Sequence, residues 1–320
     1  MKCSSYFPFF DTNPIVLAPM AEVNDLSFRK MCRNHGIVLC WTGLIDAHFW
    51  VTEKTKRSSV FRTDSLDRPL VCQLLGCDIH ELISTAKDLE PFCDFLEINC
   101  GCTHNFAKRK QCGYYMIMNE ATRERTKSII DQFCKSVSKP VSIKFRIIED
   151  SEGNPDHNAT LAFAQDMIQC GVSFIVLHAR QKSFDKKGSP NYNVVKDIAR
   201  QINIPIIVNG GIKSKHEAQE VIQNTGAVLA MCGQSLLKNP SLFDFIDTQN
   251  PYDLSHEYIE IATRNGEPFY LIKKHIFQFF EDFIRENSDF AQKVSDSVKI
   301  DDLLRVLNDF NNMVNYEKNS

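Results

Sequence analysis

The stretch FLEINCGCTHNFAKRK, residues 95–110, gathers the side chains best suited to chemistry in this sequence. Its first residues, Phe95 to Ile98, form a short apolar run that predicts a buried strand, and at Asn99 the sequence changes into a polar turn. Cys102 therefore follows the carboxyl end of a strand, and the cations Lys108 to Lys110 follow a few residues later. A thiol so placed is suited to act on an anionic ligand above a sheet or barrel.

The cysteines of this turn also allow other roles. Cys100 and Cys102, with Cys112 ten residues after Cys102, could suggest zinc, but the usual Cys-x-x-Cys spacing and a clear partner pair are missing. We expect Cys100 and Cys112 to be structural. Cys102 can be a catalytic thiol, a metal ligand or a buried filler, and we predict no metal site.

Glycine-rich turns follow two later apolar runs. VNGG contains Gly210 and Gly211, and AMCGQ contains Gly233. Backbone N–H groups in such turns can approach a phosphate because no Cβ stands in the way, although the glycines could also serve only as tight turns. Lys144, inside another apolar run, favours a bound phosphorylated cofactor, because a lysine inside a barrel needs an opposite charge.

Cations and a histidine follow further runs. In VLHAR, His178 and Arg180 could hold a cofactor oxygen or an RNA phosphate, whereas the alternative is a histidine satisfied within the core. Lysines and arginines also follow two of the apolar runs, on the side where the predicted strands end. They could form a local basic rim that the net charge hides, made of Lys108, Arg109, Lys110, Lys182, Lys186 and Lys187.

Eight short apolar runs position these side chains, and stretches of helical length usually separate them. The runs are Pro14 to Leu17, Gly36 to Trp41, Pro69 to Leu74, Phe95 to Ile98, Pro140 to Phe145, Val172 to Leu177, Pro205 to Val208 and Ala227 to Met231. Helices with capping signals are expected at Asp78 to Leu89, Asn119 to Ser136, Asn158 to Cys170, Val194 to Gln201 and Lys215 to Thr225. Eight strands over about 230 residues predict an α/β fold, the (β/α)₈ TIM barrel, with the polar residues on its active face.

After the eighth run the sequence reads as helices only. From about Tyr258 onward, one apolar stripe runs from Tyr270 to Phe283 and another from Ile300 to Phe310. We expect a barrel domain over residues 1–250 and a small all-helical domain over residues 251–320, with the boundary near Pro251.

The composition is that of an ordinary globular protein. Of the 320 residues, 43% are hydrophobic and 24% are charged, and the net charge of −3 gives no global sign of nucleic-acid binding. The 12 cysteines lie mostly in apolar segments, which indicates reduced thiols. No signal peptide and no run long enough to span a bilayer is seen, so we expect a cytoplasmic protein, with the nucleus as a second compartment.

At these residues the sequence resembles the tRNA-dihydrouridine synthases, flavin-dependent enzymes with a (β/α)₈ barrel and a C-terminal helical domain. The matching pieces run in family order across the barrel. They are APMAEVNDLSFR, QLLG, EINCGCTHNFAKRKQCGYYM, SIKFR, LHAR, VNGG and KNPSLF. The AKR and IKFR segments are most similar to the eukaryotic class that acts on tRNA D-loop positions 16 and 17.

The resemblance implies FMN as cofactor, NADPH as reductant and tRNA as substrate, with no obligate protein partner. Reduced FMN would deliver hydride to C6 of a flipped-out uridine, and Cys102 would protonate C5. The uracil edge or a nearby phosphate would be held by Asn99, Arg146 and Arg180, with Lys108, Arg109 and Lys110 as further substrate contacts. FMN would contact Pro19, Met20, Ala21, Gln73, Lys144, His178, Asn209, Gly210, Gly211, Gly233 and Gln234.

Two positions depart from the family pattern. Thr103 stands where the family usually has a proline after the catalytic cysteine, which raises the question of whether the thiol is correctly aimed. Gln234 stands where many members have arginine, so one charge is missing from the phosphate site. In the helical domain, Lys273, Lys274 and His275 are expected to line the second wall of a tRNA cleft.

Two other functions are compatible with these motifs. A small-substrate flavin oxidoreductase of the dihydroorotate-dehydrogenase type would use the same barrel, but it needs neither the helical tail nor the basic loops. A tRNA-binding barrel that has lost flavin chemistry is suggested only by Gln234.

Overall fold

The structure is a computed structural model that describes residues 14–183, 188–244 and 250–319. The described residues form two compact units. The first unit contains the described residues of Met1–Asn24 and Ile37–Gly233. The second unit contains Asp25–Gly36 and the described residues of Gln234–Ser320. Division into independently folding domains at residues 250 and 251 stays a proposal.

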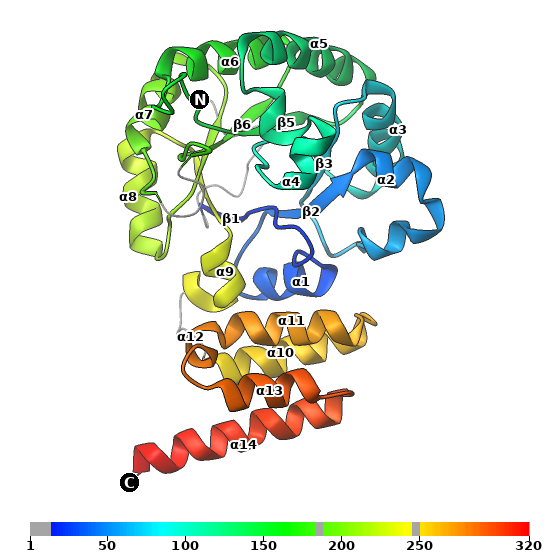
Figure 1. Ribbon diagram of the computed structural model, residues 1–320, viewed down its shortest axis with the longest axis vertical. Coiled ribbons are helices and arrows are strands. Elements are labelled where there is room, and N and C mark those ends of the chain that lie inside the picture. Colours follow the sequence, from blue (N-terminus) through cyan, green and yellow to red (C-terminus); the bar gives the residue numbers. More distant parts are fainter. Residues whose placement is uncertain (1–13, 184–187, 245–249, 320) are drawn as a thin grey trace. The chain divides into compact units, whose positions relative to one another are not determined.

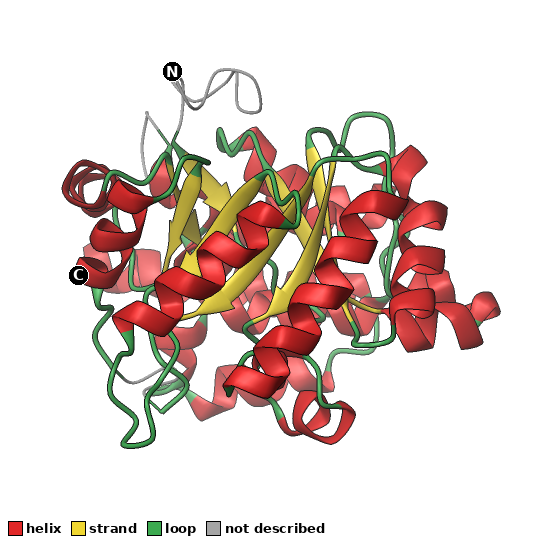
Figure 2. Cartoon of the chain, turned by 90° about the horizontal axis from the view of Figure 1, so that it is seen from above, coloured by secondary structure: helices red, strands yellow, loops and turns green. Residues whose placement is uncertain are grey.

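Eight parallel strands in the first unit close into a barrel, which confirms the predicted fold (Figure 2). Each strand pairs with its neighbour in the sequence, and β1 pairs with β8. The strands are β1 (Ile15–Leu17), β2 (Cys40–Asp46), β3 (Leu70–Leu75), β4 (Phe95–Cys100), β5 (Val141–Arg146), β6 (Phe174–His178), β7 (Ile206–Asn209) and β8 (Leu229–Cys232).

The predicted bounds of the second strand were wrong. The apolar run from Gly36 to Trp41 supplies only the first residues of β2, which continues past Thr42 and Gly43 to Asp46. Its pairing with β3 shifts register between Trp41 and Leu44. At this irregularity the Thr42 hydroxyl accepts a hydrogen bond from the backbone N–H of Gln73, 3.1 Å away. A side chain thus replaces a backbone partner, which apolar periodicity does not reveal.

Helices surround the barrel, in positions that the sequence mostly predicted (Figure 1). Asp78, Asn119 and Ser214 cap α3, α5 and α8 with side-chain hydrogen bonds to the first helical turn. Two short helices, α2 and α4, were not predicted. The helices are α2 (Ala47–Thr52), α3 (Ile79–Leu89), α4 (Asn105–Lys110), α5 (Glu120–Ser136), α6 (His157–Gln169), α7 (Tyr192–Gln201) and α8 (Lys215–Thr225).

The barrel interior changes from apolar to polar along the strands. Val71 and Phe95 belong to its apolar core, together with residues from the other strands. Two positions further along the same strands stand Gln73 and Glu97, both buried. Because side chains alternate between the two faces of a strand, these polar groups also point into the barrel. They lie closer to the carboxyl ends, where the predicted site residues are.

The second unit is entirely helical in its described part, as predicted from Tyr258 onward. A cluster of phenylalanines packs α11 to α14 together, with the rings of Phe283 and Phe310 4.6 Å apart. The helices are α1 (Leu26–Asn34), α9 (Gln234–Lys238), α10 (Pro251–Arg264), α11 (Phe269–Phe279), α12 (Glu281–Ile284), α13 (Ser288–Asp296) and α14 (Ile300–Asn319). None of the described helices is both long and apolar enough to cross a membrane.

The helix α1 belongs to this second unit through buried polar contacts. Asp25, which caps α1, lies 2.7 Å from Nε2 of His275 and accepts a hydrogen bond from the hydroxyl of Tyr258 at 3.1 Å. His275 is fully buried. The expectation that His275 lines an RNA-binding wall was therefore wrong, because its ring is used to hold α1.

Candidate active site at the carboxyl ends of the barrel strands

The barrel brings most of the predicted site residues to the carboxyl ends of its strands. Gln73, Asn99, Lys144, Arg146 and Asn209 are each at most 9% exposed, although all five side chains are polar. Burying such groups is unfavourable unless they are hydrogen-bonded, so their partners define the site.

Lys144 is the buried cation of the site. Its Nζ donates a hydrogen bond to Oδ1 of Asn209 at 2.8 Å, and Nδ2 of Asn209 donates to the carbonyl of Met231 at 2.9 Å. Burial lowers the pKa of Lys144 to about 8; the negative charge of Glu97 opposes this shift, and Arg146 adds to it. Lys144 can thus stay protonated at neutral pH and attract an anion.

His178 is held as a neutral ring. Burial, followed by the charges of Lys144, Arg146 and Arg180, lowers its pKa well below the usual value. Nε2 lies 3.4 Å from Nη1 of Arg180. Because a guanidinium can only donate, Nε2 is the accepting nitrogen and Nδ1 carries the ring proton. His178 can therefore offer a neutral hydrogen-bond donor.

The loop that carries Cys102 is fixed on both sides of the thiol. Oδ1 of Asn99 accepts hydrogen bonds from the backbone N–H groups of Gly101 at 3.0 Å and Cys102 at 2.9 Å. The carbonyl of Cys102 accepts from the backbone N–H of Tyr114 at 3.0 Å. A Cβ on Gly113 would lie 2.7 Å from this carbonyl oxygen, so only glycine allows the two segments to approach this closely.

Thr103 does not leave this loop unsupported. Its carbonyl accepts a hydrogen bond from the hydroxyl of Tyr115 at 3.2 Å. Arg146 adds a further bond, because its Nε donates to the carbonyl of Gly101 at 2.9 Å. Contacts before and after Cys102 thus constrain the loop without the proline of the family pattern. Cys102 itself is partly exposed, as a reacting group must be.

The glycines after β7 and β8 make close approaches that a side chain would disturb. Gly210 has a φ of +117°, and a Cβ there would lie 2.8 Å from the ring of His178. A Cβ on Gly233 would meet Ala18 at 3.3 Å and the sulfur of Met20 at 3.4 Å. Together with the buried ammonium of Lys144, these side-chain-free turns fit a phosphate ester.

The remaining cofactor residues predicted from the sequence occupy less buried positions. Pro19 and Met20 are half-buried after β1, and Ala21 is exposed. Gln234 follows Gly233 directly and opens α9 in the second unit. Their contact with FMN stays a prediction.

The predicted basic rim differs from residue to residue. Lys108 and Arg109 are exposed in the last turn of α4, whereas Lys110 forms an ion pair with Asp46, the residue that caps α2. The ammonium of Lys182 lies 5.2 Å from the ring centre of Tyr115, within the range of a cation–π contact. Two further members, Lys186 and Lys187, lie outside the described residues.

Arg180, predicted to hold substrate, is bonded within the protein. Its Nε donates to the carbonyl of Gly188 at 2.6 Å, in addition to the contact of Nη1 with His178. Arg146 likewise donates from Nη1 to the carbonyl of Gln181 at 3.4 Å. Both guanidiniums tie strand ends to loops, and their contact with substrate stays a prediction, as does that of Asn99.

Glu97 is the main residue that the sequence interpretation missed. It is fully buried, and its carboxylate accepts hydrogen bonds from Nε2 of Gln73 at 2.7 Å and from the hydroxyl of Ser142 at 3.1 Å. Burial raises its pKa to about 7, while Lys144 and the hydrogen bonds oppose this shift. The available signal was an acidic residue in the middle of the apolar run FLEIN, at an inward-facing position.

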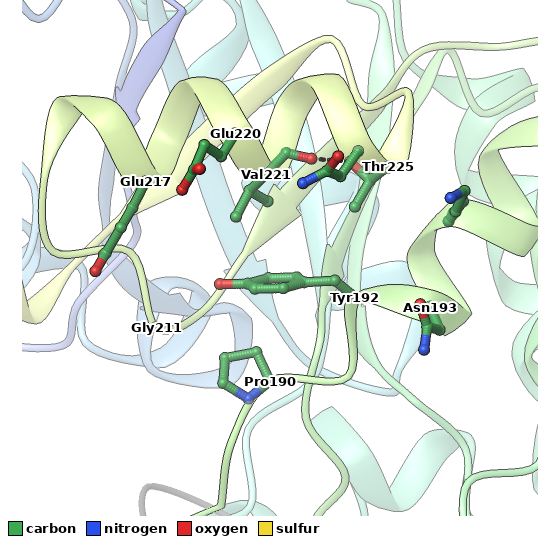
Figure 3. A pocket seen from close by; sticks show the side chains of 10 residues that line it. Pro190, Tyr192, Asn193, Gly211, Glu217, Glu220, Val221 and Thr225 are labelled. Atoms are coloured by element: carbon green, nitrogen blue, oxygen red, sulfur yellow. Dashed lines mark hydrogen bonds between the residues drawn. The ribbon is translucent and has the colours of Figure 1, made fainter.

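A cavity of about 530 Å³ lies between α7 and α8, and Gly211, which follows β7, is one of its lining residues (Figure 3). The hydroxyl of Tyr192, one of its lining residues, donates to the carbonyl of Gly210 at 2.6 Å. Its other walls include Pro190, Glu217 and Val221. Tyr192 thus connects the wall of this cavity to the Gly210 turn of the candidate site. Among the described residues, no group of three or more His, Cys, Asp or Glu side chains could hold a metal ion.

Known proteins are similar to this chain in sequence along most of its length. A family model described as dihydrouridine synthase (Dus) matches residues 16–314. A human protein named tRNA-dihydrouridine(20a/20b) synthase [NAD(P)+]-like is 30% identical over 270 residues, which cover 83% of this chain and 81% of that protein. A tRNA-dihydrouridine synthase B of Pasteurella multocida is 31% identical over 239 residues, which cover 74% of this chain and 69% of the relative.

A mouse protein named tRNA-dihydrouridine(16/17) synthase [NAD(P)(+)]-like is 25% identical over 286 residues. The match covers 88% of this chain but only 58% of the mouse protein. The relatives therefore divide between proteins named for positions 16/17 and for positions 20a/20b.

Proposed function

Because the chain belongs to the dihydrouridine synthase (Dus) family, we propose that it reduces the C5=C6 bond of a uridine in tRNA, with FMN as cofactor and NADPH as reductant. The observation that carries the proposal is the Cys102 loop. The loop presents a partly exposed thiol, and hydrogen bonds fix it before and after that residue. This arrangement fits a proton donor that must meet one carbon atom of a bound base.

The residues around Lys144 would hold FMN. Its ammonium and the turns at Gly210 and Gly233 suit the phosphate, and the neutral ring of His178 offers a hydrogen bond from Nδ1. Gln73 and Asn209 provide amides at the same strand ends. When bound, FMN supplies the hydride that reaches C6 of the uracil, after its own reduction by NADPH.

Cys102 would supply the proton that C5 requires. An ordinary cysteine thiol has a pKa of about 8.5, so at neutral pH it is mostly protonated and able to donate. The uridine must leave its stack to reach this thiol, and a folded loop of RNA releases a base at a lower energetic cost than a duplex. The hydrogen-bonded backbone on either side of Cys102 would keep the thiol near its place when the base arrives.

The basic rim is the surface that we expect to bind tRNA. Lys108 and Arg109 are exposed beside the Cys102 loop, where phosphates flanking the target uridine would pass. The proposed helical RNA-binding domain carries less positive charge for phosphate contacts, since residues 251–320 contain 8 lysines and arginines against 13 acidic residues. In addition, the ammonium of Lys273 donates to the carbonyls of Ser295 and Ser297.

We place the target in the D-loop, at positions 16 and 17. This choice rests on the AKR and IKFR segments, and it competes with positions 20a and 20b, for which the human relative is named. Mapping the modified position in a defined tRNA transcript decides between the two.

The proposal is tested with purified protein that has been reconstituted with FMN. We expect NADPH-dependent formation of dihydrouridine in unmodified tRNA, and its loss in Cys102→Ala with FMN still bound. The affinity for tRNA should fall steeply as the salt concentration rises, whereas an enzyme for a small substrate should not bind tRNA at any salt concentration. Protein that cannot take up FMN, or Cys102→Ala protein that still forms dihydrouridine, would contradict the proposal.

A further inference from the structure

Glu97 is the buried carboxylate of β4, and no step of the proposed reaction uses it. One of its oxygens, Oε1, accepts a hydrogen bond from Nε2 of Gln73 at 2.7 Å, and Oε2 accepts from the hydroxyl of Ser142 at 3.1 Å. The side chain is fully buried. A buried carboxylate is unfavourable, so its presence beside the candidate site needs a reason.

The hydrogen bonds that begin at Glu97 continue as far as Cys102. Since Nε2 of Gln73 points to Glu97, its Oε1 points the other way and accepts from Nδ2 of Asn99 at 2.8 Å. The oxygen of the Asn99 amide is thereby left for the backbone N–H groups of Gly101 and Cys102. Each amide donates at one end and accepts at the other, so every bond in the chain runs in the same direction.

The groups at both ends of the chain decide this direction, because the backbone N–H groups of Gly101 and Cys102 can only donate and an ionised Glu97 can only accept. An amide can be turned by 180° with little change in shape, and neither Gln73 nor Asn99 alone prefers one orientation. While Glu97 is ionised, its Oε1 can only accept from Gln73. The hydroxyl of Ser142 can either donate or accept, so a proton on Oε2 would leave the direction unchanged.

We propose that Glu97 is a positioning residue, which orients the amides of Gln73 and Asn99 and through them fixes the loop that carries Cys102. The inference rests on the proposed function only in that it gives this loop a catalytic task. The contacts themselves belong to the protein without cofactor or substrate.

Reversing the chain provides the test. In Asn99→Asp, Oδ1 still accepts from the backbone N–H groups of the loop. Oδ2, however, replaces the donor Nδ2 and faces Oε1 of Gln73, so that two acceptors meet. If the Gln73 amide turns to donate to Oδ2, its own oxygen faces the carboxylate of Glu97, and again two acceptors meet. Adding Glu97→Gln supplies an amide N–H to the turned Gln73, so that every group again has a partner and the total charge equals that of the wild type. The double variant should therefore be rescued relative to Asn99→Asp.

Two readouts need neither flavin nor tRNA. The first is the rate at which iodoacetamide alkylates Cys102, measured by peptide mass spectrometry against the partly exposed Cys77 in the same sample. The second is the midpoint of thermal unfolding. At pH 9, Asn99→Asp should change the relative alkylation rate at least about threefold and lower the midpoint, because a buried polar group is left unpaired. The double variant should return both to near wild-type values.

The pH adds a signature that a general loss of packing would not produce. At pH 6 a protonated Glu97 can donate to the turned Gln73, so the defect of Asn99→Asp should be smaller than at pH 9. The double variant should lose this difference, because glutamine does not titrate. Lys144 is the cation facing Glu97, and both variants keep it. Asn119→Asp, at the N-cap of α5, is the matched control and should leave Cys102 unchanged.

Additive effects in the double variant, or wild-type behaviour of Asn99→Asp, would overturn the inference. If Asn99→Asp does not fold, the double variant alone decides: folded protein with wild-type alkylation of Cys102 supports the inference, and unfolded protein overturns it. Absence of dihydrouridine formation by the wild type would instead contradict only the proposed function.

Discussion

The side chain of Asn99 accepts a hydrogen bond from the backbone N–H of Cys102, with 2.9 Å between oxygen and nitrogen. This bond joins the last part of a buried strand to the residue that carries the candidate proton donor. The same oxygen also binds the N–H of Gly101. The position of the Cys102 backbone is thus set by the barrel itself.

Replacing Gly113 by alanine should displace Cys102. The new methyl group would lie 2.7 Å from the Cys102 carbonyl oxygen and 3.0 Å from its Cβ, in a backbone conformation with φ of +63°. We expect uridine reduction to fall at least about tenfold, which corresponds to roughly 1.4 kcal/mol, while NADPH still reduces the bound flavin. Separate measurement of the two half-reactions by stopped-flow spectroscopy checks this.

Gly153→Ala is the matched control for that variant. Gly153 has a similar positive φ of +85°, but a Cβ there would meet only the hydroxyl of Ser183, at 3.9 Å. Both variants therefore carry backbone strain, and only one presses on Cys102. Equal loss of uridine reduction in the two would show that strain, and not the contact with Cys102, is responsible.

Lys144→Met should weaken FMN binding. The variant removes the buried cation and leaves Oδ1 of Asn209 without its donor at 2.8 Å. Hydrogen bonds to charged groups contribute about 1.5–3 kcal/mol, so the dissociation constant should rise at least about tenfold in a fluorescence titration. Lys135→Met, on the exposed surface of α5, is the control. A Lys144→Met affinity within about twofold of the wild type would remove Lys144 from the site.

Binding of FMN should also weaken as the pH rises through about 8. Burial lowers the pKa of Lys144 to about 8 in the free protein, so the ammonium is lost above that pH. A bound phosphate would favour the charged form and shift this transition upward. Titrations from pH 6 to 10 should show the fall in the wild type. Its persistence in Lys144→Met would assign it to another group.

The stability of the helical unit should depend on pH through His35. Its ring lies 3.0 Å from Asp244 and 2.8 Å from Glu257. Burial alone would lower the pKa of His35, but hydrogen bonds to Glu257 and Asp244 outweigh burial and raise the pKa above its usual 6.5. For Glu257, burial favours a higher pKa, but the hydrogen bonds with His35 and Asn34 and the charge of His35 together outweigh it and lower the pKa below 4.5.

The sign of the effect follows from these two shifts. The His35 contribution is complete below pH 6.5 and disappears as the pH rises through its folded pKa. The Glu257 contribution is complete above pH 4.5 and disappears as the pH falls through its folded pKa. The difference in unfolding free energy between wild type and His35→Gln should thus be largest between pH 4.5 and 6.5. A constant difference from pH 4 to 9, measured by urea denaturation, would contradict this.

Substituting Lys108 and Arg109 by alanine should weaken tRNA binding and flatten its salt dependence. For each phosphate that the variant no longer neutralises, the slope of log K against log salt should decrease by about 1. Lys87→Ala is the control. It removes one exposed charge near the C-terminal end of α3, which is the end of that helix away from the carboxyl ends of the strands. An unchanged slope in the double variant would exclude these two residues from the RNA-binding surface.

The sequence predicted most of the barrel, but only part of the candidate site. Short apolar runs separated by helical stretches report burial, so most strands and the positions of Lys144, His178 and Asn209 could be predicted. The register shift within β2 could not, because a threonine hydroxyl replaces a ladder hydrogen bond there.

Contacts between distant residues were the second kind of information that the sequence withheld. The sequence around His35 does not show that its ring binds Glu257, more than 200 positions away. The assignment of α1 to the helical unit could therefore not be predicted. Gly113 was likewise missed, because only the folded chain brings it against Cys102. Glu97 was visible as an acid in an apolar run, but its meaning depends on the orientation of two amides.

Mapping of dihydrouridine in cellular tRNA tests the central claim most directly. Cells that lack this protein are supplied with the wild-type chain or with Cys102→Ala, and the modified positions are read in each tRNA. We predict that D-loop dihydrouridine is missing without the protein, returns with the wild type and does not return with Cys102→Ala. Unchanged dihydrouridine in the cells that lack the protein, or full restoration by Cys102→Ala, would contradict the assignment of Cys102 as the proton donor of a tRNA-uridine reductase.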